Sequence, residues 1–521
     1  MKRHVRVLIA SPNGNGCGLA LVRVSDEQVL ALSVVPKWWS PYCEPISINL
    51  DKEMPPGLSV HEVIPELGRI SLESHDAWLL DSVVAALTGL VFRDDGEGDD
   101  EPGETPLFAV VPERKIRLGS NSFLVGDSQR RDGSHLSEAF WSGVESIGSS
   151  DLIRLPIGQD SEHSALLAEQ HLPDAPSFER VMRELFVKEV ERVLTRRMPE
   201  FRRQVGVLPF IRGQISVESV IARQARKSLD VQCEFDELDN DHPWQRLVRT
   251  AVRAVAARDM TDFESSGNRA ALRRANRCRT IDLRMADVPL ISPNHALQVS
   301  PSAVRLSRNR HAAVAAHLAQ QVLLKAAPVG FRRRRSHLPV IATGVRIASA
   351  RLFERLLACV PTTPEGLQVH ENQVRLTLLR GVPAGKRPDL LMTRNSEGGP
   401  RVVALIDAKN KARIASSPRL MSGKDQYQQF AYAVVSGLPT LFVFAASPST
   451  DWQVSSTYET NLAGPKPGPH VATAQIPFPS PSEVLWVEQI APSLGSVLNS
   501  FLQQVSLHSR DSRISTTTES H

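Results

Sequence analysis

The sequence is poor in aromatic residues and cysteines for its length. Of 521 residues, 5% are Phe, Trp or Tyr. The five cysteines are Cys17, Cys43, Cys233, Cys278 and Cys359, without a Cys-x-x-Cys pair among them. An odd number of isolated cysteines argues against a disulfide framework and a structural zinc site. Because such usage is typical of a reducing compartment, we expect a cytoplasmic protein.

Long apolar runs, a targeting segment and a nucleotide-binding loop are also missing. No run approaches the ~20 apolar residues that a membrane helix needs. The first ten residues form a strand-like run broken by Ser11-Pro12-Asn13-Gly14, which is unlike a signal peptide. No Gly-x-x-x-x-Gly-Lys-Ser/Thr loop occurs. We therefore expect no membrane association and no motor activity in this chain.

Acidic and basic residues are distributed unevenly. Residues 1–170 hold 14 Lys or Arg against 26 Asp or Glu, residues 171–340 hold 30 against 18, and residues 341–521 hold 17 against 13. The differences, −12, +12 and +4, sum to the net charge of +4. A basic middle third is the electrostatic footprint of a polyanion partner, whereas the acidic first third is poorly suited to DNA.

Length and patterning predict an α+β protein of several domains. Alternating apolar residues at 5–10, 19–24 and 28–35 indicate strands, and helical spacing over 178–194 indicates a long helix. We expect a β-rich N-terminal region (1–170), a mainly helical basic middle region (171–340), a C-terminal α/β core (341–505) and a disordered tail (506–521). Further strands are expected at 439–445 and 483–487, and a last helix at 492–502.

Three smaller features have competing interpretations. The acidic run 93–104 has no apolar residue and is typical of an exposed loop rather than a metal site. The Trp38-Trp39 pair fits a core position better than a partner contact. The acids between Glu234 and Asp241 are expected to cap the following helix rather than bind metal.

Three charged residues of the last third are predicted to converge. Asp389 begins an apolar run, a turn at 395–399 follows, and a second run ends in Asp407-Ala408-Lys409. This pattern predicts a β-hairpin. Because side chains alternate along a strand, Asp407 and Lys409 share one face. Charges at strand ends often only meet water, so the interpretation also depends on the flanking segments.

Two carboxylates and a lysine suit metal-assisted phosphodiester hydrolysis. Oxygen ligands favour Mg²⁺, with Mn²⁺ as an alternative, and Mg²⁺ is often held by one or two carboxylates with substrate phosphate. A lysine beside the metal would orient the attacking water and offset negative charge on the phosphate. The pattern Pro-Asp, spacer, Asp-x-Lys resembles the PD-(D/E)xK restriction-endonuclease-like core, with Asp389, Asp407 and Lys409 as the matching positions.

The flanking segments strengthen this prediction. An amphipathic helix around Glu354 precedes the hairpin. A second helix follows it, in which residues 425, 428, 429 and 432 share one face. A helix, three strands, a helix and a strand in this order form the αβββαβ core of such nucleases.

Taken together, these segments resemble McrC, the nuclease subunit of McrBC modification-dependent restriction systems. The matching segments are Leu352-Phe-Glu354, Arg387-Pro-Asp389, Leu405-Ile-Asp407-Ala-Lys409-Asn-Lys411, Asp425-Gln-Tyr-Gln428 with Tyr432, Leu208-Pro-x-x-Arg212-Gly213 and Cys233-Glu-Phe-Asp-Glu237. Together they cover roughly residues 175–450. Asn410 departs from the family, which often has an aromatic residue there.

The resemblance implies a role for each site residue. Asp389 and Asp407 would hold Mg²⁺ with the Ala408 carbonyl, and Lys409 would position the attacking water. Glu354 would support the metal shell, and Gln428 would contact the site or the scissile strand. The resemblance also implies a separate McrB-like AAA+ GTPase or ATPase partner, which we expect the N-terminal region to contact as a stalk. Arg212 would be a further partner contact.

Double-stranded DNA is the expected polyanion. Residues 251–340 hold 16 Lys or Arg against 5 Asp or Glu, a density that favours a phosphate track. The candidate DNA-binding residues are Arg273, Arg274, Arg277, Arg332, Arg333, Arg334, Arg335 and Lys411. Two other functions fit the same sequence: a non-catalytic regulator of the motor built on a nuclease scaffold, and a stand-alone DNA or RNA repair nuclease.

Overall fold

The computed structural model describes two compact units. The described residues are 3–10, 16–23, 28–42, 124–126, 131–148, 152–153, 176–195, 200–215, 218, 220–221, 231–239, 241–299, 310–326, 342–361, 363, 366–372, 387–397, 399–410, 423–454, 458–459, 468–482 and 484–515. One unit comprises 1–156, 172–181 and 335–521, and the other comprises 157–171 and 182–334. Within the described part, no helix is long and apolar enough to cross a membrane.

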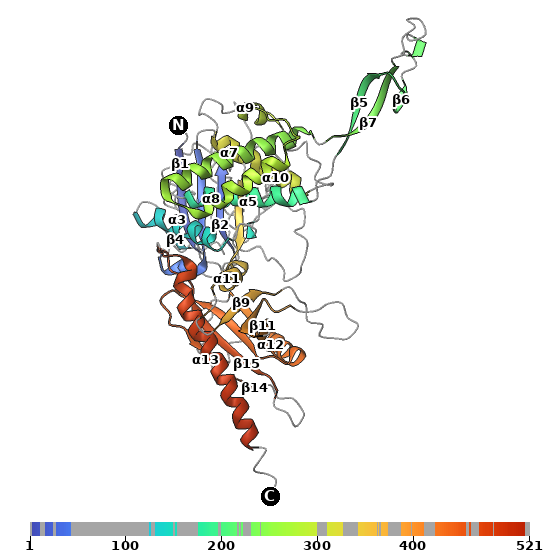
Figure 1. Ribbon diagram of the computed structural model, residues 1–521. Coiled ribbons are helices and arrows are strands. Elements are labelled where there is room, and N and C mark those ends of the chain that lie inside the picture. Colours follow the sequence, from blue (N-terminus) through green and yellow to red (C-terminus); the bar gives the residue numbers. More distant parts are fainter. Residues whose placement is uncertain are drawn as a thin grey trace, which may run out of the picture. The chain divides into compact units, whose positions relative to one another are not determined.

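The N-terminal strands share a sheet with a strand from the last third of the chain. The three predicted strands are confirmed as β1 (Arg3–Ala10), β2 (Gly16–Arg23) and β3 (Gln28–Val35). With β4 (Leu124–Gly126) and β8 (Ala342–Ala348) they form a sheet in the order β4-β1-β3-β2-β8 (Figure 1). The backbones of β2 and β8 approach so closely at Gly18 that an added Cβ would lie 2.0 Å from the Val345 carbonyl oxygen. The predicted acidic loop at 93–104 lies outside the described residues.

A larger sheet in the same unit carries the predicted hairpin. Its order is β13-β15-β12-β11-β10-β9, with β14 also pairing β15. The strands are β9 (Leu367–Glu371), β10 (Leu390–Ser396), β11 (Gly399–Lys409), β12 (Thr440–Ala446), β13 (Gln453–Val454), β14 (Tyr458–Glu459) and β15 (His470–Pro477). β9, β10 and β11 are antiparallel, whereas β11, β12 and β15 are parallel. β12 is buried along its whole length, as expected for a central parallel strand.

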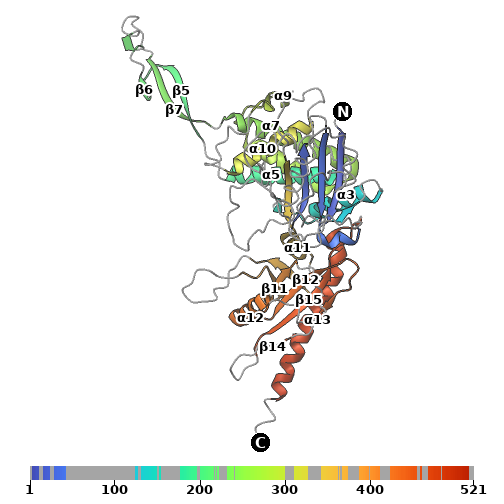
Figure 2. The same ribbon diagram turned by 180° about the vertical axis from the view of Figure 1, so that it is seen from behind.

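The predicted order of helix, three strands, helix and strand is present. α11 (Ser349–Ala358) precedes β9, and α12 (Gly423–Ser436) lies between β11 and β12 along the chain (Figure 2). Leu405 of β11, Tyr432 of α12, and Phe442 and Phe444 of β12 form one buried cluster. This packing holds α12 against the two strands that flank it in the sequence.

The C-terminal end differs from the prediction. The strand expected at 483–487 is wrong, because α13 (Trp486–Ser515) starts within it. Trp486 is buried against Trp39 and Phe478, with ring centroids 5.9 and 5.5 Å away. These tertiary contacts override the strand-like local pattern. α13 also continues through 506–515, where disorder was expected.

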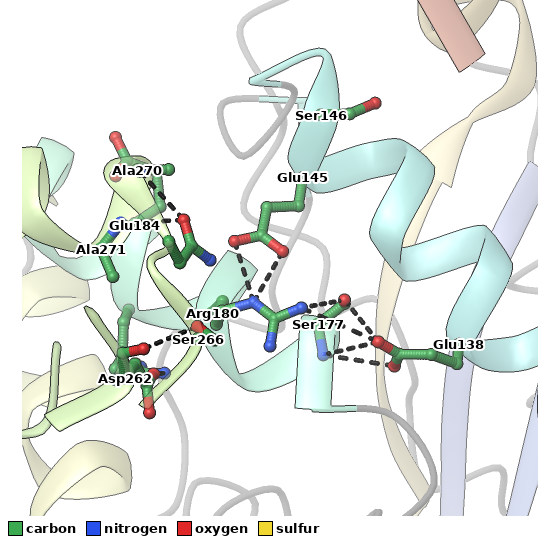
Figure 3. Close-up of polar contacts among 12 residues, drawn as sticks. Glu138, Glu145, Ser146, Ser177, Arg180, Glu184, Asp262, Ser266, Ala270 and Ala271 are labelled. Atoms are coloured by element: carbon green, nitrogen blue, oxygen red, sulfur yellow. Dashed lines mark hydrogen bonds and ion pairs between the residues drawn. The ribbon is translucent and has the colours of Figure 1, made fainter. Parts of the chain in front are cut away.

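Polar contacts join α3 (Arg131–Ser146) to the start of α5 (Pro176–Thr195), the helix predicted at 178–194. The Glu138 carboxylate accepts hydrogen bonds from the backbone N–H and hydroxyl of Ser177 (Figure 3). Arg180 donates to Glu145 over 2.8 Å. A carboxylate at the first turn satisfies free amides and complements the helix dipole.

The described part of the second unit is mainly helical. Its helices are α5 from Met182 onwards, α7 (Pro243–Ser266), α8 (Arg269–Arg284), α9 (Pro293–Ala296) and α10 (Arg310–Ala326). Asp259 of α7 is fully buried and pairs with both Arg274 and Arg183 at 2.6 Å. A buried charge is tolerated because it is paired on both sides.

A small sheet, β5-β7-β6, belongs to the same unit. Its strands are β5 (Glu200–Leu208), β6 (Gln214–Ile215) and β7 (Val231–Asp239). The predicted acidic cap is wrong, because the acids from Glu234 to Asp239 lie in β7 and α7 starts after His242, whose side chain makes no cap bond. The strand register sets Arg202 opposite Glu237 and Arg203 opposite Asp236.

Candidate active site

Asp389 lies directly before β10, at the end of the hairpin opposite its turn. Its Oδ2 accepts a hydrogen bond of 2.9 Å from the backbone N–H of Ala408. Its own carbonyl accepts from the N–H of Asn372, and the Asn372 side chain donates to the Pro388 carbonyl, both at 3.0 Å. Asp389 is therefore fixed to both neighbouring strands of the sheet.

Asp407 and Lys409 end β11 and share one face, as predicted. Lys409 Nζ lies 2.7 Å from Asp407 Oδ1 and 5.1 Å from the ring centroid of Phe442. Asp407 is 1% exposed, whereas the Lys409 side chain retains 11% exposure. Since Ala408 lies between them and donates to Asp389, the three predicted residues are brought together at one strand end.

Gln428 of α12 bridges this group. Its Nε2 donates to Asp407 Oδ2 at 3.0 Å and contacts the Tyr432 hydroxyl at 2.8 Å, while its Oε1 accepts from Lys409 Nζ at 3.3 Å. The Tyr432 hydroxyl in turn donates to the Arg387 carbonyl. Residues 428 and 432 lie one helical turn apart, so a single face of α12 ties both strands of the hairpin together.

Glu354 of α11 is a partly buried acid with its own cation. It lies 3.0 Å from Arg351 Nη1. Burial, and then the negative charge of Asp389, raise the pKa of Glu354 to about 7, whereas Arg351 opposes the shift. The charge of Asp389 therefore acts on Glu354, and the support of the metal shell by Glu354 stays a prediction.

Asp389, Asp407 and Lys409 together form a charged centre, and burial has the largest effect on the pKa of each. It raises the pKa of Asp389 and raises that of Asp407 well above its usual value, the latter reinforced by the Asp389 charge. Burial alone would lower the pKa of Lys409, but the nearby carboxylates of Asp407, Asp389 and Asp425 outweigh it and raise that pKa. Asp389 and Asp407 disfavour each other's ionised form, so a nearby cation stabilises them. Lys409 keeps its proton and stays an ammonium.

The donor set fits Mg²⁺. Within the described ranges, no group of three or more His, Cys, Asp or Glu side chains is arranged as a metal site. Asp407 Oδ1 is a buried acceptor that takes no hydrogen bond of ordinary geometry, although Lys409 lies beside it. Because Mg²⁺ usually keeps several waters and needs only one or two carboxylates, Asp389 and Asp407 meet its requirement. The Ala408 carbonyl stays a predicted ligand.

The structure separates the predicted DNA-binding arginines. Arg273 is exposed on α8. Arg274 is 2% exposed and bound to Asp259, so the prediction of a phosphate contact is wrong for this residue. Arg277 donates to Glu184 and Glu191, which occupy its guanidinium. The predicted residues Arg332, Arg333, Arg334, Arg335 and Lys411 lie outside the described residues.

Arg212 lies in the turn between β5 and β6. Its guanidinium stacks 4.3 Å from the ring centroid of Phe235. The next residue, Gly213, has a φ of +71°, and an added Cβ would lie 2.3 Å from the Glu234 carbonyl oxygen. Only glycine fits this turn, which holds Arg212 at the surface.

The sequence did not reveal the residues that hold Asn410, directly after Lys409. Lys37 and Trp38 of η1 (Lys37–Tyr42) both contact it. The Trp38-Trp39 pair was visible as an aromatic cluster, but no local pattern links it to residue 410.

Comparison with known proteins gives one family and several similar chains of solved structures, two of which are described below. The model of the family described as "McrBC 5-methylcytosine restriction system component" matches residues 157–443, more than half of the chain. No curated protein matches.

The two structures come from Thermococcus gammatolerans. A refined half-complex from a tetradecameric assembly of McrB AAA+ hexamers with bound McrC matches at 14% identity and a TM-score of 0.34, over 82% of this chain and 96% of that one. A cryo-EM structure of the McrBC complex matches at 15% identity and a TM-score of 0.22, over 51% of this chain and 73% of that one. On the family match, this chain belongs to the McrBC 5-methylcytosine restriction system component family.

Proposed function

We propose that this chain is the Mg²⁺-dependent DNA endonuclease subunit of a McrBC-like restriction complex and that it acts in the cytoplasm. The observation that carries the proposal is that Asp389, Asp407 and Lys409 lie together at one strand end. Asp389 accepts from the Ala408 N–H, Lys409 pairs with Asp407, and Gln428 donates to Asp407. The order of elements around them, α11, β9, β10, β11, α12 and β12, supports a PD-(D/E)xK core as part of this proposal. Membership of a restriction family supports DNA as the substrate.

Each residue of the centre has a role in phosphodiester hydrolysis. Asp389 and Asp407 would hold Mg²⁺, which when bound polarises the phosphate and activates water. Lys409, kept protonated by its acidic neighbours, donates hydrogen bonds to the attacking water and to a phosphate oxygen. Gln428 keeps the Lys409 amine and the Asp407 carboxylate in register, and Glu354 supports the metal shell from α11.

DNA would be held by basic residues outside the centre. Arg273 is exposed and remains a candidate, together with Arg332, Arg333, Arg334, Arg335 and Lys411. Such residues contact phosphates and do not recognise the base sequence, so we expect the affinity for DNA to fall steeply as the salt concentration rises.

A separate McrB-like AAA+ GTPase or ATPase would supply the motor. The N-terminal region and Arg212 are our proposed contacts. Residues around Arg212 support its role, because Val207, Phe210 and Ile211 are 67%, 59% and 62% exposed. Apolar side chains exposed together on one small sheet are typical of a protein-binding surface.

The test is cleavage by the full chain with its co-encoded motor, on modified and unmodified DNA, with Mg²⁺ or with EDTA. We expect Mg²⁺-dependent cleavage that falls at least ~100-fold in Asp407→Asn and Lys409→Met, since each removes a group from the charged centre. Glu397→Gln, an exposed change at the hairpin turn, is the control and should cleave like wild type.

Two outcomes would favour a function other than the proposed motor-coupled nuclease. Full activity in both Asp407→Asn and Lys409→Met would end the catalytic role of this centre and favour a regulator of the motor. Cleavage without the motor or its nucleotide would indicate a stand-alone nuclease.

A further inference from the structure

We propose that Lys37 and Trp38 of η1 are positioning residues for the nuclease centre, acting through Asn410 on the neighbouring Lys409. The inference depends on the proposed nuclease function and extends it to the N-terminal sheet. It assigns this sheet a role inside the subunit, separate from any contact with a motor.

Two consecutive residues of η1 hold the backbone carbonyl and the side-chain oxygen of Asn410. The Lys37 amine donates to the Asn410 backbone carbonyl. The Trp38 indole Nε1–H donates to Asn410 Oδ1 at 2.9 Å. Lys37 also lies 5.0 Å from the ring centroid of Trp38. Together the two bonds fix the backbone and the side chain of Asn410.

Asn410 occupies the position where β11 stops being held by the sheet. The pairing of β11 with β12 ends at Lys409 opposite Phe444, and its pairing with β10 ends at Ile406. A residue just past a ladder has lost its regular backbone partners. The η1 contacts therefore substitute for the sheet one residue after Lys409.

The support behind these contacts is rigid. η1 follows β3, a central strand of the N-terminal sheet. Trp39 is 0% exposed and donates from Nε1 to the Pro479 carbonyl at 2.7 Å. Its ring packs edge-on against Phe140 and Trp486, with centroids 6.3 and 5.9 Å away. A side chain anchored in this way transmits small displacements instead of absorbing them.

Burial of the Lys37 amine is by itself energetically unfavourable. Its side chain is 8% exposed, and burial lowers the pKa of Lys37 to about 8. Burying an amine disfavours its charged form, so a residue that served only packing would be better replaced by an apolar one. The hydrogen bond to Asn410 gives the buried amine a use.

The consequence concerns Lys409. Its amine must stay near both Asp407 and Gln428, at 2.7 and 3.3 Å. Because the next residue in the chain is pinned, the backbone of Lys409 cannot drift along the strand direction. Loosening Asn410 should therefore reduce the rate of the chemical step and leave DNA affinity unchanged.

Two tryptophans provide a matched test. Trp38→Phe keeps an aromatic ring and removes the indole N–H that donates to Asn410. Trp452→Phe makes the same change at a tryptophan that is 38% exposed, and it is the control. In the full chain with its motor, we expect Trp38→Phe to lower kcat about tenfold with unchanged KM and DNA affinity, and Trp452→Phe to leave kcat within about twofold of wild type. A tenfold change in rate corresponds to about 1.4 kcal/mol, the size of one hydrogen bond.

Substitutions of Lys37 test the inference independently of the tryptophan variants. Lys37→Met should lower kcat as Trp38→Phe does, and Lys37→Arg, which keeps a donor, should recover most of it. Equal kcat in Trp38→Phe and Trp452→Phe, or no recovery in Lys37→Arg relative to Lys37→Met, would overturn the inference.

A structural readout separates failure of this inference from failure of the proposed function. Hydrogen exchange should rise in peptides covering Leu405–Asn410 in Trp38→Phe and not in Trp452→Phe. If wild type does not cleave but exchange changes as expected, the coupling holds and the nuclease function fails. If wild type cleaves and neither kcat nor exchange separates the two variants, the positioning role is refuted.

Discussion

At the scale of single residues, Gln428 joins the two halves of the charged centre. Its amide donates to Asp407 and accepts from Lys409, so one side chain sets the distance between an acid and an amine. Only an amide of this length offers a donor and an acceptor together at this place. The bridge is consistent with a centre that must be ordered before a metal and DNA arrive.

Replacing Gln428 tests this bridge. Gln428→Leu should lower kcat for cleavage by about 30- to 100-fold, because it removes three part-buried hydrogen bonds of about 1 kcal/mol each, to Asp407, Lys409 and Tyr432. The neighbouring Tyr427 is 79% exposed, so Tyr427→Phe is a suitable control. Equal rates in the two variants would show that Gln428 does not order the centre.

Glu354 predicts a pH dependence of stability. Its folded-state pKa is raised from 4.5 to about 7, so the folded state binds more protons than the unfolded state between these values. The stability that protonated Glu354 contributes is therefore fully present below pH 4.5 and is lost as the pH rises through 7. In EDTA, the melting temperature of wild type should fall between pH 5 and pH 8 by more than that of Glu354→Gln.

A divalent ion should reverse this effect. Mg²⁺ added at pH 8 should restore part of the melting temperature of wild type, since it stabilises the ionised acids around Asp389. Identical pH dependence in wild type and Glu354→Gln would contradict the assigned pKa. The difference between the two proteins is the relevant quantity, because Asp389 and Asp407 shift in the same direction.

At the scale of elements, the contact between α3 and α13 depends on one glycine. An added Cβ at Gly143 would lie 2.0 Å from Trp486 Cε2, well inside van der Waals contact. Trp486 is 1% exposed and has no room to move within its aromatic cluster. A helix interior usually disfavours glycine, so its presence here reflects this close packing.

Two glycine-to-alanine changes should have opposite signs. Gly143→Ala should destabilise the protein by about 2 kcal/mol or more through overpacking. Gly495→Ala, in α13 with its nearest neighbour at an ordinary 3.5 Å, should stabilise it by up to about 1 kcal/mol. Urea unfolding of both variants checks the signs, and a neutral Gly143→Ala would show that the two helices separate easily.

At the scale of the whole molecule, the basic middle region divides its arginines between interior and surface. Arg274 and Arg183 neutralise the buried Asp259, whereas Arg273 faces solvent one residue away. A count of positive charges therefore overstates the surface that DNA can contact. The second unit uses part of its charge for its own stability.

Adjacent arginines should separate these two roles. Arg274→Ala should destabilise the second unit by about 3–5 kcal/mol, because it leaves Asp259 buried with one partner fewer. Arg273→Ala should leave stability within about 0.5 kcal/mol and reduce the slope of log K against log salt for DNA binding by about one. Thermal melts and binding titrations at several salt concentrations distinguish them; weakened DNA binding in a fully stable Arg274→Ala protein would reverse the assignment.

Local patterns were sufficient for most elements and for the charged centre. Alternation placed β1 to β3, helical spacing placed α5, and the hairpin carrying Asp389, Asp407 and Lys409 followed from two apolar runs around a turn. Gln428 followed from its place on the helix face of Tyr432. These features depend on neighbours within a few residues, so the sequence by itself determined them.

Contacts between distant segments were decided only by the tertiary structure. Trp486 starts a helix because it packs on Trp39, and Arg274 is interior because Asp259 is opposite it. Lys37 reaches Asn410 across 373 positions of sequence. No local period encodes such pairs, because their free energy arises only when the chain has folded and water has been excluded from between them.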